Sequence, residues 1–180
     1  MCGCDNGPRE NYLKIGVPLY EASIRCNWKA AKAILDTNPD LVRYSITDHE
    51  ETALHVAASA KGDPKDVKEF VSNLVEKMDI EDLALQNESS NTALYLAAAA
   101  GNVETVKIMV EKSRILLKIP GAKQMLPLYA AALFGNLDVV KYLYEQSNEL
   151  CVAEGWTNQN RGWFLEKCVE NDMFGKHFST

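Results

Sequence analysis

The sequence predicts an all-α solenoid in which short helix-turn-helix units stack side by side, with β-turn fingers between them. Three observations favour this fold class. A short apolar phrase recurs along the 180 residues, at intervals close to those of one class of helical repeat. Each copy is anchored by a leucine, and small residues and turn formers follow that leucine at constant offsets. The anchoring leucines are Leu19, Leu54, Leu94 and Leu128.

The residues at these offsets suit two short helices joined by a tight turn. Alanine three residues after each leucine lets the helices approach closely, and Gly101 and Gly135, at offset +7, end a first helix and permit the turn. Apolar residues at offsets +12, +15 and +16 then form one face of a second helix. Asparagine recurs at offset +8. The alanines at +3 are Ala22, Ala57, Ala97 and Ala131, and the asparagines at +8 are Asn27, Asn102 and Asn136. The apolar residues at +12, +15 and +16 are Ala31, Ile34 and Leu35 in the first unit, Val106, Met109 and Val110 in the third, and Val140, Leu143 and Tyr144 in the fourth.

The pattern resembles the ankyrin-repeat family, whose signature is T-P-L-H-x-A-A-x-x-G followed by a second apolar helix. The clearest copies open at Thr52-Ala53-Leu54-His55, at Thr92-Ala93-Leu94-Tyr95 and at Leu126-Pro127-Leu128-Tyr129. The resemblance implies about four full repeats plus a partial fifth. It also implies that the ligand is another protein, with no cofactor, metal ion or small-molecule substrate.

The chain divides into three parts. Residues 1–11 are polar and rich in Gly and Pro, so we expect a disordered lead-in, while residues 12–150 hold repeats one to four. Residues 151–180 hold a partial fifth repeat and a tail, with Leu165 as anchor, Cys168 at +3 and Phe174 at +9. Because no second helix follows, we expect apolar surface to remain partly exposed there, and the chain looks truncated.

Repeat one is predicted to run from about Tyr12 to Tyr44. Its helices are expected at 17–26 and 28–36, and Asn38-Pro39-Asp40 ends the second one. Trp28 occupies offset +9, where Val103 and Leu137 stand in later repeats, and this favours packing in the core.

Repeat two carries one extra residue between its helices, at 61–64, and a longer second helix that ends at 74–75, before a link over 78–87. Fingers are expected at 47–51, 87–91 and 121–125, although the first lacks the glycine common at a fingertip. Threonine before a first helix caps its free N–H groups. Leu126 stands where that threonine would be, which weakens the cap by about 1 kcal/mol.

His55 invites a catalytic or metal-binding interpretation. It stands at the histidine position of the family signature, and we expect its ring to bond to neighbouring turn groups. The sequence contains no Gly-rich phosphate loop, HExxH, GxSxG or paired zinc-ligand spacing, and Cys168 with His177 is too slight to indicate a nucleophile and base. We therefore expect a protein that is not an enzyme.

Composition limits the other partners. The net charge of −6 and the lack of a basic run argue against nucleic acid and anionic lipid. Five cysteines without a CxxC pair favour a reducing compartment, and no apolar run reaches the roughly 18 residues that span a bilayer. We expect a soluble, cytoplasmic chain. Cys2 and Cys4 either carry fatty acyl groups or have no role.

A narrower resemblance concerns residues 12–175. The long second repeat and the phrases Asp82-Leu83-Ala84-Leu85-Gln86-Asn87 and Leu128-Tyr129-Ala130-Ala131-Ala132-Leu133-Phe134-Gly135 are similar to the plant ankyrin proteins related to accelerated cell death and increased salt tolerance. Those relatives have a C-terminal domain of transmembrane helices. The resemblance implies a scaffold in stress, defence or cell-death signalling. The alternative is the truncated cytoplasmic part of a multi-pass membrane protein acting in signalling or transport at the plasma membrane.

The family binds partners with its fingers and the adjoining surface of the first helices. The first two fingers are acidic, which suggests a basic or mixed partner segment with Leu133 and Phe134 as an apolar anchor. Alternatively, the acidic residues are solvated tips and Phe134 packs on its neighbour, or the domain is a spacer without a partner. The candidate residues are Asp48, His49, Glu50, Glu51, Glu88, Ser89, Ser90, Asn91, Lys123, Gln124, Met125, Arg25, Leu133 and Phe134, with Ile24, Ser59, Ala60, Ala99 and Ala100 at the same helix offsets.

Overall fold

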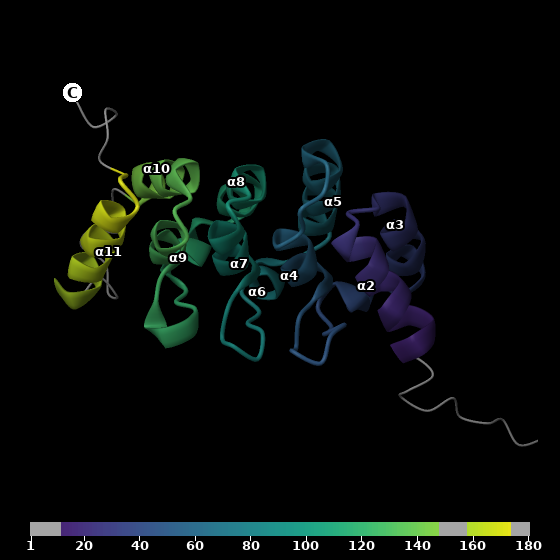
Figure 1. The fold of residues 1–180 in the computed structure, drawn as a ribbon. Coiled ribbons are helices and arrows are strands. Elements are labelled where there is room, and N and C mark those ends of the chain that lie inside the picture. The colour runs from purple at the N-terminus through teal and green to yellow at the C-terminus, as the bar shows by residue number, and fades with distance from the viewer. Residues whose placement is uncertain (1–11, 148–157, 174–180) are drawn as a thin grey trace, which may run out of the picture.

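The structure is a computed structural model that describes residues 12–147 and 158–173. Figure 1 shows helix pairs in a row, with α2 and α3 at one end and α11 at the other. The described residues contain helices and turns, and their one β-bridge joins Gln86 and Thr92. The predicted all-α solenoid is therefore confirmed. The pairs are α2 (Val17–Ile24) with α3 (Trp28–Thr37), α4 (Ala53–Ala58) with α5 (Pro64–Glu76), α7 (Ala93–Ala100) with α8 (Val103–Lys112), and α9 (Pro127–Leu133) with α10 (Leu137–Gln146), followed by α11 (Asn158–Glu170).

The core runs along the stack as one continuous cluster. Each first helix packs against the next, in the order α2, α4, α7, α9 and α11. The four anchoring leucines are at most 5% exposed, and the alanines at offset +3 are also buried. The leucine and alanine positions read from the sequence are thus the ones that hold neighbouring units together.

The same turn closes α2, α7 and α9 but not α4, which ends without a residue of positive φ. The N–H of Asn102 donates to the carbonyl of Ala97 at 3.0 Å, across a residue with positive φ, Gly101 (φ 80°). Glycine is required here for space as well, because a Cβ on Gly101 would lie 2.7 Å from Oδ1 of Asn136. Cys26 (φ 49°) adopts this conformation in the first unit without being glycine.

Asparagine side chains connect the third and the fourth unit to the unit before each of them, whereas the second unit has a glycine at this offset. Nδ2 of Asn102 donates to the carbonyls of Ala58 (2.6 Å) and Ala60 (3.2 Å), which lie at the end of α4. Nδ2 of Asn136 donates in the same way to the carbonyls of Ala98 and Ala99, both at 2.8 Å. We call this contact the asparagine joint.

The helix caps agree with the sequence. The Thr92 hydroxyl accepts the backbone N–H of Tyr95 at 3.2 Å, as expected for a threonine in front of a first helix. Leu126, at the same place before α9, makes no side-chain cap. The proline that follows Leu126 opens α9 without losing a hydrogen bond.

Four short helical segments connect the pairs and a fifth precedes the first pair, and the sequence did not indicate them. In the link after α5, Asp82 is only 6% exposed. Its Oδ1 accepts Nη2 of Arg43 at 2.6 Å and Nε at 2.9 Å, which ties this link to the end of the first unit. The segments are the π-helix η1 (Tyr12–Gly16), the 3₁₀ helices η2 (Pro39–Val42), η3 (Arg114–Lys118) and η4 (Ala122–Gln124), and the short α6 (Ile80–Leu83).

The register predicted for the fifth unit is correct. The N–H of Met173 donates to the carbonyl of Cys168 at 2.8 Å across Asp172 (φ 49°), which repeats the turn after α2, α7 and α9. Leu165 has the register of an anchor but not its burial, because it is 53% exposed. The predicted exposure of apolar surface is therefore confirmed at this helix.

The joint to this unit is made from a different offset. Nδ2 of Asn171, at +6, donates to the carbonyl of Ala132 at 2.8 Å, whereas the residue at +8 is the buried Met173. The predicted position of Phe174 and the predicted disorder of residues 1–11 lie outside the described residues.

Two residues assigned to the core lie less deep than predicted. Trp28 is half-buried and meets the fully buried Phe70 edge to face, with ring centroids 5.9 Å apart. Tyr144 is 47% exposed, so the predicted apolar face of α10 is narrower than its sequence suggests. Within the described parts of the chain, no helix is both long enough and apolar enough to cross a membrane.

Candidate protein-binding surface

Each predicted finger is a closed turn. In the finger at 47–51, the N–H of Glu50 donates to the carbonyl of Thr47 at 3.2 Å. The N–H of Ile46 donates to the carbonyl of Glu51 at 2.7 Å and closes the base of the same finger. Glu50 takes a φ of 59°, the conformation usually given to glycine, so the missing fingertip glycine costs backbone strain here.

The other two fingers repeat this arrangement. At 87–91 the N–H of Ser90 (φ 61°) donates to the carbonyl of Asn87 at 2.8 Å. At 121–125 the N–H of Gln124 donates to the carbonyl of Gly121 at 3.1 Å, and the N–H of Gly121 to the carbonyl of Met125 at 2.8 Å. Figure 1 shows the fingers projecting from the same edge of the stack.

Neighbouring fingers are bonded to one another. The N–H of Glu88 donates to the carbonyl of His49 at 3.0 Å, and Oε2 of Glu88 lies 3.0 Å from Nδ1 of His49. The Glu88 carboxylate raises the pKa of His49, which favours its charged form. The next pair is linked through Asn91, whose Oδ1 accepts the N–H of Ala122 at 2.8 Å. The fingers therefore form a connected row.

His55 supports this row from below. Its Nδ1 accepts from the hydroxyl of Thr52 at 2.8 Å, and its Nε2–H donates to the carbonyl of Asn91 at 3.1 Å in the neighbouring finger. The ring is 2% exposed. The predicted structural role of His55 is confirmed, and the described residues contain no cluster of three His, Cys, Asp or Glu suited to a metal ion.

Burial lowers the pKa of His55 below its ordinary value of 6.5. Because the unfolded chain then binds a proton that the folded chain does not, we expect the contribution of His55 to stability to decline as the pH falls below about 6.5. Urea unfolding at several pH values between 5 and 7.5, for the protein and for His55→Gln, measures this. The protein should lose more stability on acidification than the variant. Equal losses in the two would contradict the prediction.

Most of the predicted site residues are exposed, with six exceptions. Glu51 and Asn91 are half-buried, and Met125 is 8% exposed. Met125 packs with Tyr95 and Ala130 in a small second cluster, so its prediction as a surface residue is wrong. Ala60 is also buried, and Ala99 and Ala100 are half-buried. The exposed ones are Asp48, His49, Glu50, Glu88, Ser89, Ser90, Lys123, Gln124, Ile24, Arg25, Ser59, Leu133 and Phe134.

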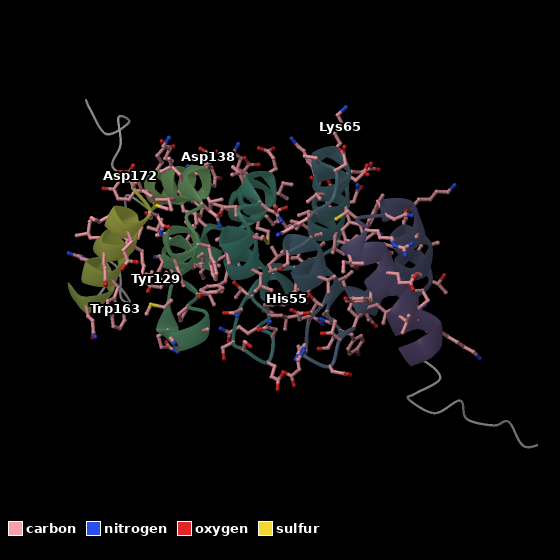
Figure 2. The ribbon with its side chains drawn as sticks, viewed as in Figure 1. His55, Lys65, Tyr129, Asp138, Trp163 and Asp172 are labelled. Atoms are coloured by element: carbon pink, nitrogen blue, oxygen red, sulfur yellow. The ribbon has the colours of Figure 1, made fainter. Side chains whose placement is uncertain are left out.

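The sequence did not single out two aromatic residues on this surface. Tyr129 and Trp163 are half-buried and pack against the cluster around Met125. Figure 2 shows them on neighbouring first helices, α9 and α11. Tyr129 follows its anchoring leucine directly, as Tyr20 and Tyr95 do, and this offset is the signal that could have identified it.

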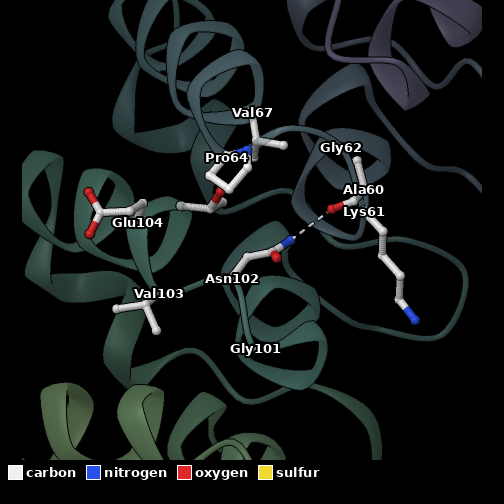
Figure 3. Close-up of a pocket in the computed structure, with 10 residues that line it drawn as sticks. Ala60, Lys61, Gly62, Pro64, Val67, Gly101, Asn102, Val103 and Glu104 are labelled. Carbon is white, nitrogen blue, oxygen red and sulfur yellow. Dashed lines mark hydrogen bonds between the residues drawn. The ribbon is translucent and has the colours of Figure 1, made fainter.

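Figure 3 shows a recess between the α4–α5 loop and the start of α8, and the asparagine joint from Asn102 crosses it. Its volume is about 230 Å³. No finger residue lines this recess, so the recess is separate from the candidate surface. The residues that line it are Ala60, Lys61, Gly62, Pro64, Val67, Gly101, Asn102, Val103, Glu104 and Thr105.

Comparison with known proteins identifies the repeats. A family model described as ankyrin repeats, in three copies, matches residues 58–154, which is more than half of the chain. No curated protein matches the sequence.

Proposed function

Because the chain belongs to the ankyrin-repeat family, whose repeats are protein-interaction modules, we propose that it binds a protein partner along its row of fingers and the adjoining ends of its first helices. The observation that carries this proposal is the bonding of one finger to the next through Glu88 and Asn91. A row that is already connected loses little conformational freedom when a partner binds. In this proposal, four full repeats and a partial fifth carry the row of fingers.

The charges of the row favour a basic partner segment. Exposed carboxylates at Asp48, Glu50 and Glu88 lie in the two bonded fingers. Leu133 and Phe134, at the end of α9, are 39% and 61% exposed. A segment that carries lysine or arginine and one large apolar side chain complements both features, the charges guiding encounter and the apolar residue anchoring the complex.

The test is an array of peptides that combine two basic residues with one aromatic residue, beside the same peptides with the basic residues replaced by glutamate. The protein should bind the basic peptides selectively. The finger variant D48K/E50K/E88K should lose that binding by more than tenfold. The matched control E69K/E76K/E145K changes the charge equally on exposed positions of the second helices and should retain it.

Phe134→Ala provides an independent check, because it removes the apolar anchor without changing charge. It should weaken binding of the same peptides by about tenfold. Equal binding by the protein and the finger variant would show that the acidic tips are only solvated. No binding of any basic peptide would contradict the proposed partner chemistry.

We further propose, from the resemblance to the plant ankyrin proteins described above, a scaffold role in stress, defence or cell-death signalling. The alternative proposal is the cytoplasmic part of a membrane ankyrin protein at the plasma membrane. Fractionation of native cells with an antibody against the finger at 47–51 separates the two. A soluble band near 20 kDa favours a free cytoplasmic adaptor, and a larger band retained in the membrane favours the alternative.

A further inference from the structure

We propose that the partner segment carries opposite charges at its two ends. Its basic end lies over the fingers at 47–51 and 87–91, which we call the acidic fingers, and its acidic end lies over the finger at 121–125, which we call the basic finger. This inference rests on the proposed binding along the row of fingers, and it adds to that proposal the charge pattern of the partner and its placement on the row.

Charged residues of one sign are grouped along the chain. Residues 44–60 and 78–103, which include the first and the second finger, have three and four acidic residues and no lysine or arginine. Residues 112–137, which include the third finger, have four basic residues and no aspartate or glutamate. The sign of the charge therefore changes between the second finger and the third. The acidic residues are Asp48, Glu50 and Glu51, then Asp79, Glu81, Asp82 and Glu88, and the basic ones are Lys112, Arg114, Lys118 and Lys123.

At the fingertips most of these charges are available to a partner. Asp48 and Glu50 are exposed, and neither forms an ion pair with another described residue. Glu88 is exposed and paired only with His49 of the neighbouring finger, which neutralises it while His49 is protonated. Lys123 is exposed at the tip of the basic finger, and it too forms no ion pair within the described parts of the chain. A partner therefore meets carboxylates at two fingers and an ammonium group at the next.

The basic finger is held against its acidic neighbour. Nε2 of Gln86 donates to the carbonyl of Ser90 in the second finger and to the carbonyl of Pro120 at the base of the third, both at 2.9 Å. The two fingers also approach closely, because a Cβ on Gly121 would lie 2.7 Å from Oδ1 of Asn91. The spacing between the two signs of charge is therefore fixed before a partner binds, which lowers the entropy cost of binding.

The surface beside the basic finger is apolar. Tyr129 and Trp163 are half-buried and pack on the cluster around Met125 of this finger. Figure 2 shows these two aromatic residues on the neighbouring helices α9 and α11. Leu133 and Phe134, at the end of α9, belong to the same unit and are exposed. The aromatic residue of the partner segment therefore lies next to the acidic end, and the order along the segment is basic, aromatic, acidic.

The acidic end of the segment determines its placement more than its affinity. Ion pairs between exposed groups contribute little to affinity, because water screens the charges and two long side chains must be ordered. We therefore expect an acidic end to strengthen binding about threefold over a neutral end. Salt screens such pairs further, so this gain should disappear near 1 M NaCl, where the screening length is about 3 Å.

The test compares two peptides by fluorescence anisotropy with the full chain. Both peptides have the same basic end and the same aromatic residue, and the other end carries two glutamates in one and two glutamines in the other. The protein should bind the glutamate peptide about three times more tightly at low salt. The net charge of −6 would by itself weaken binding of an acidic end, so a gain reports the local charge of the basic finger.

Variants of the basic finger assign the gain to one residue. Lys123→Gln should remove the difference between the two peptides and leave binding of the glutamine peptide unchanged. Lys123→Glu should reverse the difference, so that the glutamate peptide binds less tightly than the glutamine peptide. The matched control is Lys65→Glu, which changes the net charge equally at an exposed position on α5, and Figure 2 shows Lys65 at the edge of the stack away from the fingers. This control should keep the preference for the glutamate peptide.

A photoreactive residue at either end of the glutamate peptide locates that end on the protein. The acidic end should crosslink to the basic finger and the basic end to the acidic fingers. Equal affinity for the two peptides, or crosslinks in the opposite order, would overturn this inference and leave the proposed binding by the fingers in place, whereas no binding of either peptide would contradict both. Self-association that Lys123→Glu abolishes would also overturn the inference, because a second copy of the chain would then occupy the row.

Discussion

Phe70→Ala is expected to destabilise the protein by about 3–5 kcal/mol, the range for removing a fully buried aromatic side chain. Phe70 is completely buried on α5, where it belongs to the continuous core and meets Trp28 of the preceding unit edge to face. The change leaves a cavity between two units, and the packed helices around this cavity cannot move far enough to fill it. Thermal unfolding should shift down on the order of 10 °C. Urea unfolding measures the same loss as a free energy.

Trp28→Ala supplies the control for this prediction. Trp28 is only half-buried, so its removal alone should cost less than that of Phe70. A double-mutant cycle should give a coupling of about 0.5–1.5 kcal/mol for the aromatic pair. A loss below 1 kcal/mol for Phe70→Ala would show that the α3–α5 packing contributes little to the stack.

Thr105→Val is expected to stabilise the protein by about 1–2 kcal/mol. Thr105 is fully buried near the start of α8, and among the described residues its hydroxyl is the buried side-chain group that finds no hydrogen-bond partner. Valine has nearly the same shape and removes the unsatisfied group. The next unit already has Val139 at the corresponding offset, fully buried. The midpoint of urea unfolding should rise.

Thr92→Val is the matched control, since Thr92 is equally buried but its hydroxyl accepts the N–H of Tyr95. This variant should lose about 1 kcal/mol by removing a cap. If both variants shifted stability in the same direction, the assignment of Thr105 as an unsatisfied group would be contradicted.

The helix pairs were predictable because the residues that form them act locally. The glycine at 101 is needed for a left-handed turn, and Thr92 caps the helix that follows it, so each leaves a signal at its own position. The short α6 left none, because a single turn has no hydrophobic period. What fixes it is the contact of Asp82 with Arg43, and that partner lies in the preceding unit.

The candidate site was predictable in outline and not in detail. The acidic tips at Asp48 and Glu50 follow from the repeat register. The bond from Glu88 to His49 depends on how closely two fingers approach, which the sequence does not specify. Met125 was misplaced for the same reason: its burial comes from Tyr95 of the neighbouring unit.

The asparagine joints also bear on how the chain folds. The bond from Asn102 to Ala58 and the bond from Asn136 to Ala98 each join residues only about one unit apart in sequence. Contacts between neighbouring units close short loops, and such contacts favour fast folding. Folding then starts at whichever pair of units forms first and spreads to its neighbours. During synthesis, the unit that supplies the acceptor carbonyls leaves the ribosome before the unit that supplies the asparagine, so each joint closes once its later unit has been translated.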